Sequence, residues 1–214
     1  GMEERHSKEL LHLRQSVNVS LYLPIIQEYL GVDLPHRYHF IVSPMIKGVN
    51  TQNVLYTRTD GPPDIYSLSS LEDAAHAKLE SFQKTAWHEV CHTVVDAWTK
   101  SQSNVLNKFE PLYSFMKGRA KNQYQGPPGW LHMVDEHIIR AICARLTTIV
   151  YGDAEGSAQM EKERSEGFVF IGSFYEALRR YELERSQFPT LKDYYPAFNS
   201  LLNTFFNKMA KGRN

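Results

Sequence analysis

The residues whose types and spacing could do chemistry are His88, Glu89 and His92, in the segment His-Glu-Val-Cys-His. Two histidines four positions apart lie one turn from each other on the same face of an α-helix. Both imidazoles can then bind a single Zn²⁺, and a glutamate directly after the first histidine can act as general base on the water that the zinc activates. The spacing therefore predicts His88 and His92 as zinc ligands and Glu89 as the catalytic residue. The alternative is a helix whose histidines only bond water or backbone groups.

A catalytic zinc needs a third protein ligand and one open coordination position. We expect that ligand to be Glu136, which lies three residues after Met133 and four before Arg140, beside the apolar stripe of a second predicted helix. The other donors in this segment are His132, Asp135 and His137. A glutamate on a solvated helix face is the alternative reading of Glu136.

Supporting groups are less defined by the sequence. Asp96 follows His92 by one helical turn, so it is a candidate to orient an imidazole, although a plain solvated carboxylate fits the same position. A peptidase also needs a hydrogen-bond donor for the oxyanion that forms during acyl transfer. The sequence offers five donors and does not choose among them: Tyr124, His132, Arg140, Tyr151 and Tyr175.

The histidines must be positioned by a helix with one packed face. The predicted motif helix spans about residues 71–101, with Ser70 as its cap, because apolar side chains recur at helical spacing beside the histidines. These side chains are Trp87, Cys91, Val94, Val95 and Trp98. Upstream, the pattern predicts a helix over 8–31 that ends at Gly31, and then a small antiparallel meander. The strands of this meander are predicted at 38–46, 53–59 and 65–69.

Downstream of the motif the chain reads as mostly helical. The pattern predicts helices at about 113–117, 130–150, 173–185 and 191–210, a rigid loop at 122–130, a polar loop at 151–167 and a short strand at 168–171. We therefore expect an α+β chain that is mostly helical, with a small antiparallel sheet before the motif helix. It should form one domain over 1–214, with a sheet-containing part at about 32–70, the motif helix at 71–101 and a helical part at 104–214.

Composition excludes several classes of function. With 42% hydrophobic residues among 214, the chain can bury a core, so wholesale disorder is not expected. The 24 Lys and Arg residues balance 24 Asp and Glu residues, which indicates no nucleic-acid-binding or polybasic membrane surface. No apolar run approaches the ~18–20 residues of a membrane span. Cys91 and Cys143 are predicted to be buried thiols rather than a disulfide, and Cys91 points to a different helix face from the histidines.

These residues together resemble a known class. His-Glu-x-x-His on one helix, with a glutamate ligand on a following helix, is similar to the gluzincin class of zinc metallopeptidases, of which thermolysin is the familiar member. Segments 136–141, 167–170 and 188–191 resemble an uncharacterised bacterial family of proposed metallopeptidases, and this resemblance covers most of the chain. It implies a zincin-like fold, a peptide or protein substrate that pairs with an edge strand, and export to the periplasm, cell surface or medium in preference to the cytoplasm.

The chain also departs from the thermolysin pattern. Thermolysin-like enzymes carry Asn-Glu-x-x-x-Asp closer to the second histidine. Here the gap from His92 to Glu136 is 136 − 92 = 44 residues, and Arg140 stands where that pattern has aspartate. The second-shell contact of the thermolysin pattern is therefore not expected in the same form.

Three functions follow as hypotheses. The first is a zinc-dependent hydrolase, and specifically a metallopeptidase. The second is a catalytically silent zincin-like domain that binds peptide or glycan, which is possible because an intact motif does not establish turnover. The third is a metal-free helical interaction domain. Cleavage specificity and oligomeric state are left open by the sequence.

Overall fold

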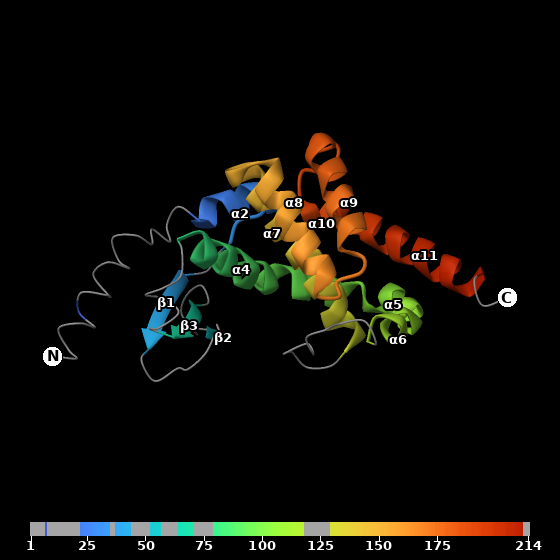
Figure 1. Cartoon of the computed structure of the whole chain (residues 1–214), viewed down its shortest axis with the longest axis horizontal. Coiled ribbons are helices and arrows are strands. Elements are labelled where there is room, and N and C mark those ends of the chain that lie inside the picture. Colours follow the sequence, from blue (N-terminus) through green and yellow to red (C-terminus); the bar gives the residue numbers. More distant parts are fainter. Residues whose placement is uncertain are drawn as a thin grey trace. The chain divides into compact units, whose positions relative to one another are not determined.

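The structure is a computed structural model, and it describes Ser7 and residues 22–34, 37–43, 52–56, 64–70, 79–117 and 129–211. Its elements in chain order (Figure 1) are α2 (Tyr22–Leu30), β1 (Arg37–Ser43), β2 (Gln52–Tyr56), β3 (Asp64–Ser70), α4 (Leu79–Ser101), α5 (Ser103–Leu106), the 3₁₀ helix η2 (Asn107–Phe109), α6 (Pro111–Lys117), α7 (Trp130–Tyr151), α8 (Asp153–Ser165), α9 (Ile171–Leu183), α10 (Leu191–Tyr194) and α11 (Pro196–Lys211). Helix predominates, as the sequence predicted. None of the helices in these ranges is both long and apolar enough to cross a bilayer.

The chain divides into two compact units, one of residues 1–28 and 32–89 and the other of residues 29–31 and 90–214. The division falls inside α4, which is one continuous helix. Ser70, the predicted cap of this helix, is the last residue of β3, and the predicted first two turns, 71–78, lie outside what the structure describes. So do most of the predicted first helix and the loop at 122–128. A single domain with the three predicted parts stays a prediction.

The first unit contains a three-stranded sheet, counted over the described residues, in the order β1-β3-β2. β2 pairs with β3 in antiparallel orientation, but β1 pairs with β3 in parallel, from Arg37 opposite Asp64 to Ser43 opposite Ser70. The predicted antiparallel meander is therefore wrong in the pairing of β1. Alternating side chains locate a strand along the chain, but they do not specify which strand becomes its neighbour.

The second unit is built around α7. All residues from Met133 to Ile139 and from Ala141 to Thr147 are buried, which is the pattern of a helix packed on every side. α8 and α9 lie side by side with it (Figure 1). The helix ends at Gly152, whose φ of 107° is open to glycine but strained for other residues. The N–H of Gly152 donates to the Thr148 carbonyl at 2.9 Å, and α8 begins at the next residue.

The predicted loop at 151–167 is wrong, because the structure forms α8 there. Its first turn contains Asp153 and Glu155 and its last turn Lys162 and Arg164, an arrangement that complements the helix dipole. The sequence of α8 shows no apolar repeat at helical spacing, because its buried residues are Gly156 and Glu163 and its exposed residues are mostly polar. A polar helix of this kind depends on its contacts with a neighbour more than on an apolar stripe.

Two further predictions at the C-terminal end need correction. The predicted strand at 168–171 is a turn followed by the first residue of α9. The predicted helix at 191–210 is interrupted at Tyr195, and α11 begins at Pro196. Proline has no N–H to continue the preceding helix, but its fixed φ suits the first turn of a new one.

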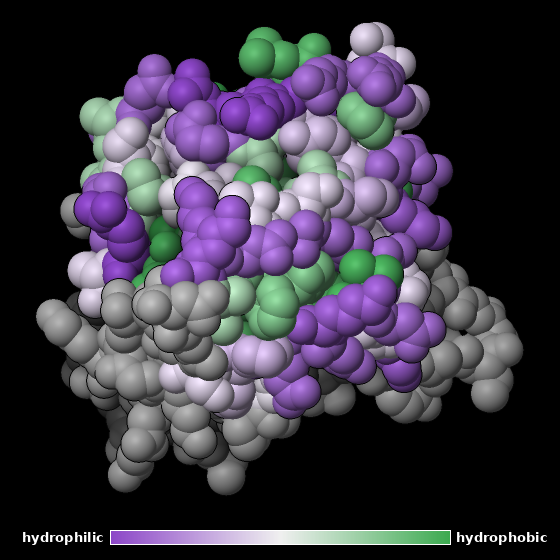
Figure 2. Space-filling model, turned by 90° about the vertical axis from the view of Figure 1, so that its right-hand side faces the viewer, coloured by the Kyte–Doolittle hydropathy of each residue, from purple (hydrophilic) through white to green (hydrophobic). Residues whose placement is uncertain are grey.

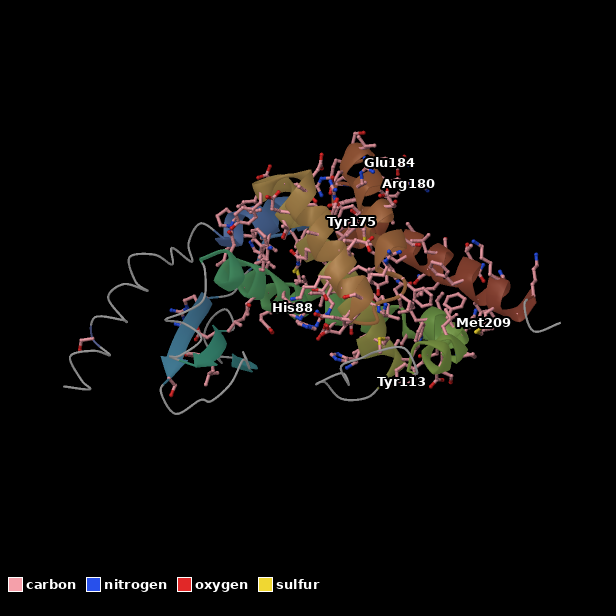
Figure 3. All side chains as sticks on the ribbon, viewed as in Figure 1. His88, Tyr113, Tyr175, Arg180, Glu184 and Met209 are labelled. Atoms are coloured by element: carbon pink, nitrogen blue, oxygen red, sulfur yellow. The ribbon has the colours of Figure 1, made fainter. Side chains whose placement is uncertain are left out.

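A buried charged network fastens α7 to α9. Arg145 donates to both carboxylate oxygens of Glu182, at 2.8 and 2.6 Å, and to the Tyr175 hydroxyl at 2.9 Å. Tyr175 is labelled on α9 in Figure 3. Tyr29 at the end of α2 donates to Glu182 at 2.9 Å as well. Such a bidentate ion pair offsets the free-energy cost of removing the arginine charge from water.

The face in Figure 2 alternates hydrophilic side chains with smaller hydrophobic areas. Among the described residues, five large hydrophobic side chains are exposed: Ile41, Val105, Ile149, Val150 and Leu183. They come from several different elements. Scattered surface hydrophobics of this kind are normal in globular proteins.

Gly156 sets how closely α8 approaches α7. A Cβ at this position would overlap Thr148 Oγ1 and would lie 2.8 Å from Thr148 Cβ and 3.0 Å from the Ala144 carbonyl oxygen. We expect Gly156→Ala to lower the free energy of unfolding by about 1–3 kcal/mol, because α8 must move away from α7. The measurement is chemical denaturation. Gly172→Ala is the control, since a Cβ there would meet only Met160 Sδ at 4.0 Å, and equal stability losses in both variants would contradict the prediction.

Candidate metal centre

Three of the predicted site residues come together in the structure. His88 and His92 on α4 and Glu136 on α7 each offer one ligand atom, and these atoms all lie within 4.8 Å of one another. Figure 3 labels His88 on α4. His92 Nε2 lies 3.2 Å from Glu136 Oε1. Glu136 from α7 thus lies next to the two histidines that the sequence spacing places on α4.

The donor set fits a zinc ion in type and spacing. Zinc bonds of about 2.0–2.1 Å in a tetrahedral arrangement separate neighbouring ligand atoms by about 3.3 Å. The 3.2 Å between His92 and Glu136 matches this value, and the wider separations close with side-chain shifts of about 1.5 Å or less. Two imidazoles and one carboxylate also form a known catalytic ligand set that leaves a position open. The cluster could therefore hold a metal ion.

α4 presents the histidines at the edge of its packed face. The predicted stripe is largely confirmed, since Trp87, Cys91, Val95 and Trp98 are buried, and Val94 is half-buried. His88, Glu89 and His92 are all half-buried, so each keeps some access to solvent. Cys91 is fully buried and free, as predicted, and Cys143 is a second free buried thiol.

Asp96 lies where the sequence predicted an orienting carboxylate. Its Oδ1 is 2.9 Å from His92 Nδ1, one turn along the same helix. When this carboxylate accepts a hydrogen bond from Nδ1–H, the imidazole is held in the tautomer that leaves Nε2 free for a metal. Nε2 is also the atom that faces Glu136.

Arg140 binds the carboxylate of Glu136 from the side away from the histidines. Its Nε donates to Glu136 Oε2 at 2.8 Å, so the two carboxylate oxygens are divided between Arg140 and the histidines. The Arg140 NH1 group donates to Glu163 Oε2 at 2.6 Å, and the guanidinium lies 4.2 Å from the centre of the Phe168 ring. Of the two roles that the sequence left open for Arg140, second shell or oxyanion donor, these contacts favour the second shell.

Glu163 was missed by the sequence prediction. It lies on α8, in the segment predicted as a loop, and is 7% exposed. A usable signal was present, because Gly152-Asp153 followed by Glu155 has the composition of a helix start. The contact between Glu163 and Arg140 joins residues 23 apart in sequence, and no local pattern encodes it.

The other donors on α7 have different environments. His137 is buried among Phe168, Phe170 and Phe174, and its Nδ1 is 2.8 Å from the Met133 carbonyl oxygen. Burial lowers the pKa of His137 to about 4, so this imidazole stays neutral. It is outside the metal-ligand cluster, which removes it as third ligand.

Asp135 and His132 flank the cluster without belonging to it. Burial raises the pKa of Asp135 to about 7, and the neighbouring Thr99 hydroxyl opposes this shift. His132 Nε2 lies 3.9 Å from Glu136 Oε1, and its ring is nearly parallel to that of His92, with centroids 6.3 Å apart. Among the described oxyanion candidates, His132 and Arg140 both lie at the cluster, but Arg140 is already hydrogen-bonded to Glu136 and Glu163.

The tyrosine candidates contribute less. The Tyr175 hydroxyl is bonded to Arg145 and to Thr148, at 2.9 and 2.8 Å, so it belongs to the α7–α9 network. Tyr151 is the half-buried last residue of α7, four turns beyond Glu136. Tyr124 lies outside the described residues.

The environment of His92 favours its protonated form, which competes with metal binding. Burial lowers the pKa of His92, but Asp96 and Glu136 outweigh that effect and raise it to about 10. A metal ligand must be neutral imidazole, so Zn²⁺ has to displace this proton. We expect about one proton to be released per zinc bound at pH 7–8, and zinc affinity to rise with pH in that range.

The measurement for proton release is calorimetry in buffers that differ in ionisation enthalpy. Asp96→Asn is the comparison, because loss of its carboxylate lowers the pKa of His92 and should reduce the number of protons released. A binding heat that does not depend on the buffer would contradict the prediction.

Comparison with known proteins finds one matching family, and the match covers most of the chain. A family model described as a domain of unknown function, DUF4932, matches residues 4–200, which include α4, α7 and α8. No curated protein and no solved structure matches the chain. On the extent of the family match, the chain belongs to the DUF4932 family.

Proposed function

We propose that this protein is a zinc-dependent hydrolase, and specifically a metallopeptidase with His88, His92 and Glu136 as ligands. The observation that carries the proposal is the convergence of these three donors within 4.8 Å, with Glu89 next to the first of them. The resemblance to gluzincin metallopeptidases supports the same donor set. A zincin-like fold and the identity of the metal as zinc are parts of this proposal.

Zn²⁺ at these ligands would lower the pKa of water to near ~7 and polarise a substrate carbonyl. Glu89 takes the proton of the attacking water on its carboxylate and delivers it to the leaving amine. His132 is our choice as donor to the developing oxyanion, because it borders Glu136 from solvent-accessible space and is 26% exposed. Asp96 and Arg140 keep the ligands in place through the two contacts described above.

The substrate in this proposal is a peptide or protein. Zincin-type enzymes commonly bind an extended peptide along an edge strand, and in the described sheet the edges are β1 and β2, with β3 between them. β3 has a strand on each side in the described sheet, so β1 and β2 are the candidates for this role. Export of the protein is a further part of the proposal and rests on the family resemblance alone.

The central test is Glu89→Gln. We expect the variant to keep stoichiometric zinc but to lose peptide cleavage by about 10²–10⁴-fold, because an amide cannot accept the proton of the attacking water. Cleavage of a broad peptide library by mass spectrometry gives activity, and plasma mass spectrometry gives metal content. Glu110→Gln, which removes an exposed carboxylate after η2, is the control and should leave both unchanged.

The outcomes separate the three functions considered. Stoichiometric zinc without cleavage by the native protein would favour the catalytically silent peptide- or glycan-binding domain. A native protein that binds no metal at saturating zinc would contradict the metal centre and favour a helical interaction domain. Equal cleavage by native protein and Glu89→Gln would contradict the role of Glu89.

A further inference from the structure

Glu163 on α8 is a buried carboxylate at the back of the metal-ligand cluster. It is 7% exposed, and its Oε2 accepts a hydrogen bond from Arg140 NH1 at 2.6 Å. Arg140 in turn donates through Nε to Glu136 at 2.8 Å. The guanidinium of Arg140 thus links Glu136, which faces the histidines, to Glu163, which does not.

The position of Glu163 follows from the packing of α8 on α7. Gly156 and Glu163 are seven residues apart, which is two helical turns, so they lie on the same face of α8. Both are buried, and Gly156 allows close approach of α8 to the Thr148 turn of α7. This approach brings Glu163 to Arg140, on the same helix as Thr148 and two turns before it.

Glu163 limits how Arg140 can bind Glu136. A guanidinium and a carboxylate favour a bidentate pair, with two parallel N–H···O bonds. Here NH1 is bonded to Glu163 and the guanidinium plane is packed against Phe168, at 4.2 Å from the ring centre. Arg140 therefore contacts Glu136 through Nε and Oε2, while Oε1 remains 3.2 Å from His92 Nε2.

Charge gives Glu163 a second effect on the cluster. Arg140 is a permanent cation close to residues that would bind a dication, and its charge alone would oppose metal binding. The carboxylate of Glu163 compensates that charge inside a largely buried environment, where charges are weakly screened. If Glu163 were neutral, Glu136 would be the one remaining anionic partner of Arg140 among these residues, and the Glu136 carboxylate would move toward the guanidinium.

We propose that Glu163 is a positioning residue for the third metal ligand and acts through Arg140. α8 is then part of the metal centre, although it supplies no ligand. This inference rests on the metal site of the proposed function, but it does not depend on whether the site cleaves peptides.

The test compares Glu163→Gln with Glu161→Gln in the full chain. Glu161 lies on the same helix but is exposed and pairs with Arg164, so its loss controls for a change of charge on α8. The measurements are zinc affinity by competition with a chelator, the visible absorption spectrum of the Co²⁺-loaded protein, and thermal unfolding without metal. We expect Glu163→Gln to weaken zinc binding by about 10–100-fold and to change the Co²⁺ spectrum, with Glu161→Gln unchanged.

The spectrum separates a positioning role from a purely structural one. Unchanged affinity and an unchanged Co²⁺ spectrum in folded Glu163→Gln would overturn the inference and leave the proposed function standing. Absence of metal binding by the native protein would overturn both. If Glu163→Gln does not fold, Glu163→Asp decides, since its shorter carboxylate should weaken zinc binding, and native affinity in this variant would overturn the inference.

Discussion

One guanidinium shared by two carboxylates organises the candidate metal centre. Arg140 lies between Glu136 and Glu163, and its planar group is packed on Phe168. Because Glu136 and Glu163 raise the pKa of Arg140 against the effect of burial, the cation is permanent. This fixed cation binds one oxygen of Glu136, while the other oxygen lies 3.2 Å from His92 Nε2. Both carboxylates are thus linked to the cluster through the same guanidinium.

The packing of α8 on α7 makes this ionic arrangement possible. Gly156 has no side chain to separate the two helices at Thr148. The close packing lets Glu163 form a direct hydrogen bond with Arg140. Burying three charged groups is costly unless each has partners of good geometry, and here the hydrogen bonds of 2.6 and 2.8 Å supply them. Helix packing and charge pairing consequently support one another. A shift of α8 would weaken both.

The site combines a local half with a distant half. His88, His92 and Asp96 are spaced by single turns of α4, so the helix alone aligns the two imidazoles and the carboxylate that orients one of them. Glu136 was favoured by the sequence over His132, Asp135 and His137, but its position beside the histidines depends on how α7 packs. His137 shows the difference clearly, because burial among phenylalanine rings keeps it neutral and outside the cluster.

The sequence by itself determined the motif helix, the pair of histidines, Asp96 beside His92 and the predominance of helix, because each depends on contacts within a few turns of one chain segment. Tertiary structure decided the parallel pairing of β1 with β3, the helix at Asp153–Ser165 and the role of Glu163. Periodicity fails for these features because their stabilising partners are far away in sequence. A polar helix whose buried residues are Gly156 and Glu163 has no apolar repeat to reveal it.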